Sequence, residues 1–411
     1  MKIVIFDDEA CRNFYPLTYT RATGDLRAGV MKLRQRVNYF LDNETEYVIV
    51  SENLKELYRE RHPDWKVNYL PEDDVLLVNS RTRITRELAE KILNLPLDHY
   101  LTNNKSLVAV RLEADEQELH AEQVDALLIA MHEEEIDGNC LWNWLWELIA
   151  ENGNLITQDF NEIFADKDNS LVTELGVTVL DPYNCWIGEG AVLKPGVVID
   201  ASGGPVIIDE GAEIMPNAVI IGPVYIGKKT RIKIGARIYQ NNTFGPDCRI
   251  GGEVEGCIIQ GFSNKQHDGF LGHCFLGEWV NLGAGTNNSD LKNNYQPVSV
   301  HSIHHNEKLE TGMQFLGALI GDHCKTGINS TINSGSVIGF GCNIYGETMV
   351  RDYIPNLRWG QVSKLYSYQK DKFLETVERV KSRRGLTLTD VEKELYIKLE
   401  HPEADNDRFS E

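Results

Sequence analysis

The chain has 411 residues, enough for two or three domains that each bury an apolar core. Apolar residues make up 42% of the chain and charged residues 25%, as in an ordinary globular protein. A formal net charge of −21 argues against nonspecific binding to nucleic acid or to anionic membranes. Small phosphorylated ligands are not excluded, because local arginines and lysines bind phosphate.

The beginning of the chain and its cysteines favour a soluble, cytoplasmic protein. One short apolar strand is followed at once by acidic residues, unlike a secretory signal peptide. The most apolar stretch, residues 141–150, is shorter than the roughly 20 residues that span a bilayer. The eight cysteines include no C-x-x-C pair, which argues against a zinc knuckle or a thioredoxin motif. Several stand where a small apolar side chain is wanted, as in a reduced protein.

Residues 1–165 alternate between short apolar segments and charged helical stretches. The predicted strands are residues 3–6, 48–50, 67–70, 75–78 and 107–112, and the predicted helices include residues 53–61 and 83–94. This alternation predicts an α/β domain with a mainly parallel sheet and covered faces. Ligands of such sheets bind at the loops that leave the strand ends.

From Cys185 to Thr348 an aliphatic residue recurs at every sixth position. These residues are Ile187, Leu193, Ile199, Ile208, Ile214, Ile220, Ile226, Ile232, Ile238, Leu276, Leu282, Ile320, Ile332, Ile338 and Ile344, with Thr326 filling one gap. The fourth residue after each is usually small, as at Ala212 and Ala218. Each repeat is a short strand and a tight corner, and three repeats close a triangular coil. The hexads therefore predict a left-handed parallel β-helix.

A helix needs a period of 3.6 residues, and a β-sandwich needs strict alternation with turns every 8–12 residues. Neither fits the hexads, so we assign residues 170–354 to the β-helix. The hexads break at residues 251–273 and 287–315, where we expect insertions extruded from one face. Residues 355–411 are expected to form a helical tail. Its basic turn at residues 379–384 is either a favourable helix-end charge or a strap that reaches a neighbouring subunit or a ligand phosphate.

Two motifs carry a resemblance that covers nearly the whole chain. Glu253 precedes His267 by fourteen residues, and Asn281 opens an N-L-G-A-G-T run fourteen residues later. These spacings resemble the acetyltransferase half of the bifunctional N-acetylglucosamine-1-phosphate uridylyltransferase/glucosamine-1-phosphate acetyltransferase family. A shorter bacterial branch of sugar nucleotidyltransferases is more similar still, with T-R-P-x-x-D-L-R-x-G and S-N-K-Q-H-D-G-F-L-G-H motifs. This chain has T-R-A-T-G-D-L-R-A-G at residues 20–29 and the second motif at residues 263–273.

The resemblance implies that His267 is the general base of an acetyl transfer. It would take a proton from the amine of an amino-sugar phosphate, which then attacks the thioester of acetyl-CoA. An imidazole, with an ordinary pKa of about 6.5, suits this task at neutral pH. Glu253 would orient or stabilise the imidazole. The alternative is that His267 is a solvated loop histidine without a catalytic role.

The same resemblance assigns binding roles to three further residues, and Lys325 is added to them as a candidate. Arg237 falls on an arginine that holds the sugar phosphate, and Asn281 falls on an asparagine that contacts the sugar. Ala284 falls where the backbone meets the CoA arm, and Lys325 is a further candidate for CoA binding.

Three residues depart from the long-form pattern. Glu255 replaces a phosphate-binding lysine, Phe270 replaces a tyrosine, and Asp290-Leu291 replaces an N-Y pair. These changes leave the identity of the sugar open. Lysines 292, 308 and 325 are the candidates to supply the missing positive charge.

The usual G-x-G-x-R nucleotide loop is absent after the first strand, where residues 7–29 stand instead. Guanidinium groups suit triphosphate oxygens, and a loop that opens onto a helix suits anions. The candidate nucleotide-binding residues are Arg12, Arg21, Arg27, Asn79 and Arg81. Nucleotidyl transfer also needs Mg²⁺, for which Asp7, Asp8 and Asp25 are candidate ligands without a distinctive motif. The alternative is a degenerate domain with surface arginines.

We therefore expect a cytoplasmic homotrimer that acts on a sugar phosphate and a nucleoside triphosphate. It would couple acetyl-CoA-dependent acetylation of an amino-sugar 1-phosphate to nucleotidyl transfer, giving a product such as UDP-N-acetylglucosamine. One alternative is a uridylyl- or thymidylyltransferase whose β-helix only oligomerises. Another is a non-enzymatic scaffold. A zinc site built from histidines 267, 273, 301, 304 and 305 fits poorly, because their spacings do not suit a metal.

Overall fold

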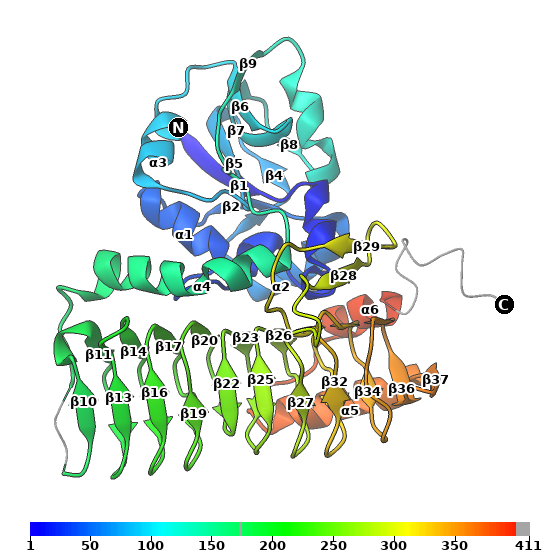
Figure 1. Cartoon of the computed structure of the whole chain (residues 1–411). Helices are drawn as coiled ribbons and strands as arrows, with labels where there is room; N and C mark the ends of the chain where they lie inside the picture. The colour runs from blue at the N-terminus through cyan, green and yellow to red at the C-terminus, as the bar shows by residue number, and fades with distance from the viewer. Residues whose placement is uncertain (172–174, 400–411) are drawn as a thin grey trace.

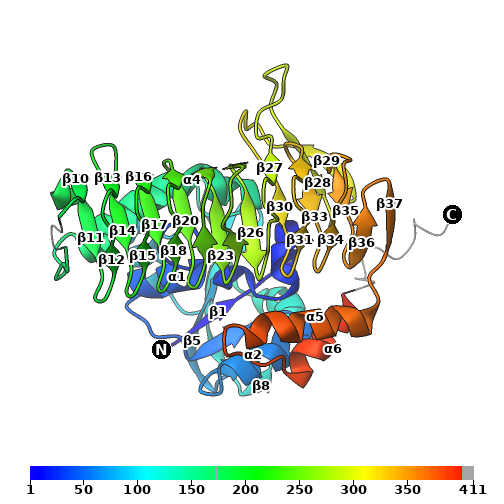
Figure 2. The same cartoon turned by 90° about the horizontal axis from the view of Figure 1, so that it is seen from below.

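The computed structural model describes residues 1–171 and 175–399. An α/β domain at the N-terminal end lies on top of a long β-helix, and two helices at the C-terminal end return toward it (Figures 1 and 2). Within the described residues, no helix is long and apolar enough to cross a membrane.

The N-terminal domain contains a seven-stranded sheet in the order β3-β2-β1-β5-β7-β6-β9. Its strands are β1 (Lys2–Phe6), β2 (Tyr47–Ile49), β3 (Lys66–Val67), β5 (Asp73–Asn79), β6 (His99–Asn103), β7 (Ser106–Ala114) and β9 (His132–Glu135). Its helices are α1 (Leu33–Phe40), α2 (Lys55–Arg61) and α3 (Arg86–Leu93), and β4 (Tyr69–Leu70) pairs with β8 (Gln117–Glu118). Only the β5–β7 and β6–β7 pairings of the seven-stranded sheet are antiparallel, as a mainly parallel sheet predicts.

The predicted strand at residues 67–70 is divided into β3 and β4. Asn68 between them has a left-handed backbone with a φ of 55°. A single strand cannot continue through that conformation, so β4 leaves the main sheet to pair with β8. The sequence pattern also left β6, β9 and α1 unassigned.

The β-helix is a three-sided prism, as the hexads predicted. Its covered face faces the N-terminal domain and contains β11 (Cys185–Ile187), β14 (Val206–Ile208), β17 (Val224–Ile226), β20 (Asn242–Phe244), β23 (Ile258–Gly261), β26 (Phe275–Glu278), β30 (Leu319–Ile320), β33 (Val337–Ile338) and β35 (Tyr353–Ile354). The Asn281 face contains β12 (Val192–Leu193), β15 (Glu213–Ile214), β18 (Arg231–Ile232), β21 (Arg249–Ile250), β24 (Asn264–Lys265), β31 (Lys325–Thr326), β34 (Asn343–Ile344) and β36 (Arg358–Gln361). Asn281 itself bridges β24 and β31 on that face.

The third side, the Glu253 face, contains β10 (Thr178–Leu180), β13 (Val198–Asp200), β16 (Val219–Ile221), β19 (Arg237–Ile238), β22 (Glu253–Glu255) and β25 (Phe270–Gly272), followed by β27 (Asn287–Asn288) and β32 (Thr331–Ile332). The chain passes from the Asn281 face to the Glu253 face at each coil, and we call the corner between them the His267 edge. The aliphatic hexad residues point into the prism and form one buried core. All eight cysteines are free thiols, and six of them are buried in the β-helix.

The two hexad breaks have different structures. Residues 251–273 contain β22 to β25 in continuous parallel register, so the expected extruded insertion there is wrong. The coil is shortened instead, because Arg249 and Asn264 are register partners only 15 residues apart. The second break is an insertion, and its hairpin of β28 (Ser299–Ser302) and β29 (Glu307–Glu310) projects toward the N-terminal domain (Figure 1).

The N-terminal domain is joined to the covered face by continuous apolar packing. Helix α4 (Leu145–Asp159) runs along this face and ends in a π-helical turn at Phe160–Phe164 (Figure 1). One buried cluster contains side chains of the N-terminal domain, the covered face and the tail, for example Leu17, Ile258 and Phe373. The domains therefore share a core.

The tail begins later as a helix than the sequence predicted. The β-helix continues through β36, which forms a hairpin with β37 (Lys364–Ser367), and only then follow α5 (Lys370–Ser382) and α6 (Asp390–Lys398). Thr389 caps α6 by accepting from the backbone of Glu392. In the basic turn, Lys381 pairs with Glu392 and Arg384 donates to Asn264 Oδ1 (3.2 Å). Residues 400–411 of the predicted tail lie outside the described residues.

Candidate functional site

The predicted acetyl-transfer residues lie on neighbouring coils of the β-helix. Arg237 and Glu253 begin β19 and β22 and are direct register partners on the Glu253 face. Arg237 Nε lies 3.4 Å from Glu253 Oε2, and both side chains are partly open to solvent. His267 is exposed on the next coil, in the corner between β24 and β25. Glu253 pairs with Phe270, three residues after His267.

The binding residues predicted beside them lie around the same corner. Asn281 is on the Asn281 face, where Asn264 Nδ2 donates to its Oδ1 (3.3 Å). Ala284 is on the His267 edge one coil after His267, and Gly285 donates its N–H to the carbonyl of Asp268 (3.0 Å). Lys325 is the next register partner of Asn281. Burial lowers the pKa of Lys325 to about 8.

The departures from the long-form pattern lie at the far end of the Glu253 face. Glu255 is the register partner of Gly272, and His273 follows directly. His273 Nδ1 lies 2.8 Å from Asp290 Oδ2, so the carboxylate that replaces an asparagine is already paired. Among the candidate lysines, Lys292 follows β27 on this face and donates to Ser299 Oγ (3.2 Å), whereas Lys308 pairs with Asp352 on the hairpin.

A cavity of about 540 Å³ lies at the carboxyl ends of β1 and β2 in the N-terminal domain. This is where ligands of parallel sheets bind. Its lining includes Asp7, Arg12, Arg21, Ser51 and Asn53 from the N-terminal domain. His304 of the β28–β29 hairpin and Lys398 of α6 complete the wall. The cavity is therefore built from three parts of the chain.

Arg12 and Arg21 are the predicted nucleotide-binding residues that line this cavity. Arg21 is buried, and its guanidinium donates to both carboxylate oxygens of Asp322 (3.0 and 2.6 Å) in the β-helix. Thr20 donates to the same carboxylate (2.6 Å). Burial alone would lower the pKa of Arg21, but Asp322 and Glu278 outweigh burial and raise it. Thr20 and Arg21, which open the motif at residues 20–29, therefore join the N-terminal domain to the β-helix.

The other three predicted nucleotide-binding residues are engaged elsewhere. Arg81 is buried, donates from Nε to Asp8 Oδ1 (2.9 Å) and reaches the carbonyl of Trp142 (2.6 Å). Asn79 is buried and donates to Asp8 Oδ2 (2.8 Å). Arg27 donates to the carbonyl of Val30 and packs over a tyrosine ring of the covered face. These contacts bind the sheet and the junction together.

The three candidate magnesium ligands have different surroundings. Burial raises the pKa of Asp7 to about 7, although Ser80 and the backbone of Thr23 donate to its carboxylate. Asp8 is paired with Arg81. Burial tends to raise the pKa of Asp25, but Lys32 and Arg34 outweigh it and hold the pKa well below its usual range. Asp7 is the one of these three that lines the cavity.

Sequence reasoning missed most of the cavity wall. Ser51 and Asn53 lie in the loop after β2, so the rule that ligands bind at strand ends was a signal that pointed to them. Glu122, His304 and Lys398 come from distant segments and carry no local signal. Within the described parts of the chain, no three histidine, cysteine, aspartate or glutamate side chains come close enough to hold a metal ion by themselves.

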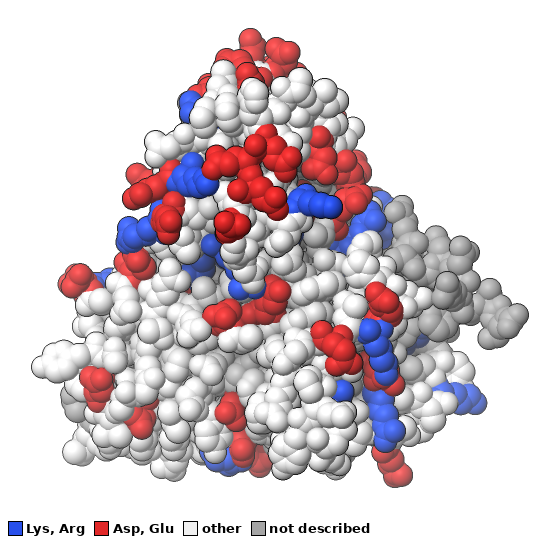
Figure 3. All heavy atoms as spheres, turned by 45° about the horizontal axis from the view of Figure 1, so that its top comes forward, with Lys and Arg blue, Asp and Glu red and all other residues white. Residues whose placement is uncertain are grey.

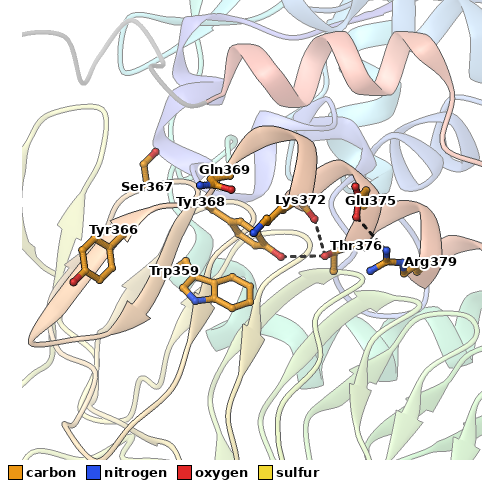
Figure 4. A pocket seen from close by; sticks show the side chains of 9 residues that line it. All are labelled: Trp359, Tyr366, Ser367, Tyr368, Gln369, Lys372, Glu375, Thr376 and Arg379. Carbon is orange, nitrogen blue, oxygen red and sulfur yellow. Dashed lines mark hydrogen bonds and ion pairs between the residues drawn. The ribbon is translucent and has the colours of Figure 1, made fainter.

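The surface also shows an uneven distribution of charge and a second cavity. Acidic side chains gather over the N-terminal domain, whereas much of the β-helix in the same view is neither acidic nor basic (Figure 3). A cavity of about 510 Å³ lies between the β36–β37 hairpin and α5, with the rings of Trp359 and Tyr368 near Lys372 and with Arg379 farther along α5 (Figure 4). Arg379 pairs with Glu375 there, and none of the predicted site residues lines it.

Known proteins resemble both parts of the chain. Bifunctional protein GlmU of Synechococcus elongatus is 27% identical over 231 residues, which cover 51% of this chain and 47% of that protein. GlmU of Methanococcus aeolicus is 27% identical over 318 residues, covering 73% of this chain and 68% of that protein. The bifunctional sugar-1-phosphate nucleotidylyltransferase/acetyltransferase of Sulfurisphaera tokodaii is 37% identical over 156 residues, covering 36% and 37%.

The match to the first of these relatives spans about half of that relative's length. The resemblance that the sequence motifs predicted is confirmed by these matches. Residues 3–168 match the family described as sugar nucleotidyl transferase. The predicted fold class is confirmed: a nucleotidyltransferase-like α/β domain is followed by a left-handed β-helix.

Proposed function

We propose that this protein acetylates an amino-sugar 1-phosphate with acetyl-CoA and also transfers a nucleotidyl group, giving an NDP-sugar such as UDP-N-acetylglucosamine. One observation carries the acetyl transfer. Arg237, Glu253 and His267 lie on consecutive coils, and the first two are in register with a 3.4 Å ion pair. The names of the GlmU relatives and of the Sulfurisphaera tokodaii enzyme support the pairing of the two activities.

In the proposed acetyl transfer, His267 takes a proton from the ammonium group of the sugar. The free amine attacks the thioester carbonyl, so a C–N bond forms as the C–S bond breaks. CoA leaves as a thiol, taking up the proton that the amine loses. Arg237 holds the sugar phosphate, Glu253 orients the imidazole, and Asn281 contacts the sugar. Ala284 and Lys325 lie along the path of the CoA arm.

In the proposed nucleotidyl transfer, an oxygen of the sugar phosphate attacks the α-phosphorus of a nucleoside triphosphate and pyrophosphate leaves. Arg12 and Arg21 line the cavity that would hold the triphosphate. Mg²⁺ commonly uses one or two carboxylates together with substrate phosphates, so Asp7 on the cavity wall fits such a site. Bound there, the ion would neutralise the charge that develops on the phosphates.

A homotrimer is part of the proposal, because the acetyl-CoA site would lie between subunits. Large apolar side chains are exposed on the His267 edge at Ile234 (63%) and Ile328 (72%). Burying such side chains against a second copy is favourable by about 25 cal/mol per Å² of apolar surface. The sedimentation mass of the full chain measures the subunit count.

The test measures two products in parallel. Thiol release from acetyl-CoA is followed with several hexosamine 1-phosphates, and pyrophosphate release is followed with UTP and dTTP. We expect His267→Ala to lower thiol release at least 100-fold, as loss of a general base does, without changing pyrophosphate release. His132→Ala, an exposed histidine on β9, is the matched control and should change neither product.

A second candidate is a nucleotidyltransferase whose β-helix only oligomerises. The sugar-contact changes at Glu255, Phe270 and Asp290 favour it, as does the match of residues 3–168 to the sugar nucleotidyl transferase family. Pyrophosphate release without thiol release from any hexosamine phosphate would establish this candidate and overturn the acetyl transfer.

A further inference from the structure

One charged residue interrupts the inner column of the Asn281 face. The column consists of register partners that point into the prism: Leu193, Ile214, Ile232, Ile250, Lys265, Leu282, Thr326 and Ile344. Lys265 is only 2% exposed and stands directly between Ile250 and Leu282. It lies two residues before His267.

The ammonium group of Lys265 is used to hold backbone at the His267 edge. Its Nζ donates to the carbonyl of His267 (2.5 Å) and to the carbonyl of Gly251 (3.2 Å) in the preceding coil. Within residues 1–171 and 175–399, it has no carboxylate within ion-pair distance. The side chain therefore joins the His267 corner to the corner below it.

The two corners are closely packed around this ammonium group. Gly252 has a left-handed backbone (φ 71°), and a Cβ on it would lie 2.6 Å from the carbonyl oxygen of His267 and 2.8 Å from Lys265 Nζ. The coil between Arg249 and Asn264 is also shortened to 15 residues. A shortened coil has few residues that can change conformation independently. A hydrogen bond to the backbone at its corner therefore also restricts the residues that follow in the chain.

Burying an ammonium group in an apolar column is unfavourable in free energy. Its transfer out of water costs free energy that two carbonyl acceptors offset only in part. Burial accordingly lowers the pKa of Lys265 to about 8. Sequences break such local packing rules mainly at functional sites, and an aliphatic residue satisfies the same position in the neighbouring coils.

We propose that Lys265 is a positioning residue that fixes the direction of the His267 imidazole by holding the carbonyl of the same residue from inside the prism. This inference rests on the proposed function, because it gives His267 a reacting partner. Lys265 itself does not touch substrate. Its contribution is to keep the exposed corner rigid where the base stands.

The experiment compares Lys265→Met with Ile250→Met, which introduces the same side chain one coil earlier in the same column. Three quantities are measured on the full chain: the Tm, hydrogen exchange of the amides of residues 266–269, and thiol and pyrophosphate release. For Lys265→Met we expect an equal or higher Tm, at least tenfold faster exchange, and at least tenfold lower kcat for thiol release. KM values and pyrophosphate release should stay unchanged, and Ile250→Met should change neither exchange nor kcat.

The inference is overturned if Lys265→Met keeps the kcat and exchange rates of the native chain. It is also overturned if Lys265→Met fails to fold or loses activity only in proportion to its unfolded fraction, since the lysine would then serve the fold. A native chain that releases no thiol with any hexosamine phosphate removes the proposed function. The exchange comparison still decides in that case whether Lys265 holds the corner.

Discussion

The covered face and the Asn281 face of the β-helix share one inner pattern and differ in their outer residues. Inward, both present stacked apolar side chains at hexad positions, interrupted on the Asn281 face by Lys265 and Thr326. Outward, the register partners of the covered face are Trp186, Ile207, Tyr225, Thr243, Ile258, Phe275, Leu319, Val337 and Tyr353. Outward on the Asn281 face they are Val192, Glu213, Arg231, Arg249, Asn264, Asn281, Lys325, Asn343 and Trp359.

This difference separates two roles of the same repeat. The inner column determines that a prism forms, because every coil must bury an aliphatic layer. The outer column determines what covers each side, because an apolar outer row needs a partner and a polar one does not. The covered face packs against α4 and the N-terminal domain, whereas the outer row of the Asn281 face is mostly polar.

The largest expected effect comes from placing a charge on the covered face. Ile258→Asp puts a carboxylate into the shared core, and we expect a loss of about 4 kcal/mol in the free energy of unfolding or failure of the domains to dock. Val192→Asp, at an outer position of the Asn281 face, should change it by less than about 0.5 kcal/mol. Urea unfolding and limited proteolysis measure both. Equal stability of the two variants would contradict the comparison.

A smaller effect is expected from the ion pair that fastens the covered side. Asp322→Asn leaves the Arg21 guanidinium buried with Glu278 (3.3 Å) as its remaining carboxylate, at a cost of about 3 kcal/mol in the free energy of unfolding. Asp352→Asn removes an exposed pair with Lys308 and should be nearly neutral. Urea unfolding at one pH compares the two. A neutral Asp322→Asn would mean that apolar packing alone holds the junction.

The smallest expected effect is a pH dependence at the cavity beside this junction. Burial raises the pKa of Asp7 from 3.8 to about 7, so between these values the folded protein binds a proton that the unfolded chain has released. Stability from this group therefore falls as pH rises, by about 2 kcal/mol between pH 5 and 7. Asp7→Asn should remove that part of the slope. Parallel stability profiles for the two proteins would show that Asp7 ionises normally.

The sequence predicted the prism well because each hexad is a local signal. Ile214 and Ile232 are recognisable from their spacing alone, and their burial follows from it. The resemblance likewise predicted that Arg237, Glu253 and His267 lie at one edge. Because the coils have nearly constant length, residues separated by about one coil in the sequence lie next to each other in space. The β6 and β9 strands escaped notice because their outer residues are polar or charged, as at Glu133 and Glu134.

Contacts between residues far apart in the sequence could not be predicted from the local sequence pattern. Arg21 lines the cavity and also donates to Asp322 about 300 residues later, and no local feature marks that partner. The shortened coil at residues 251–273 looked like an insertion because a missing hexad and an added one interrupt the period in the same way. The sequence did contain a pattern that indicates the covered face. In most of the hexads on this face, an apolar residue comes directly before the inward aliphatic residue.

The wall of the cavity at the carboxyl ends of β1 and β2 joins residues of the N-terminal domain, such as Asp7, to Lys398 and Leu399 of the tail. During synthesis the N-terminal sheet emerges well before α6, so this wall is complete only after Lys398 has been made. This cavity is thus among the last features to be assembled. A ribosome-bound chain would present its N-terminal α/β domain with that cavity still open on one side.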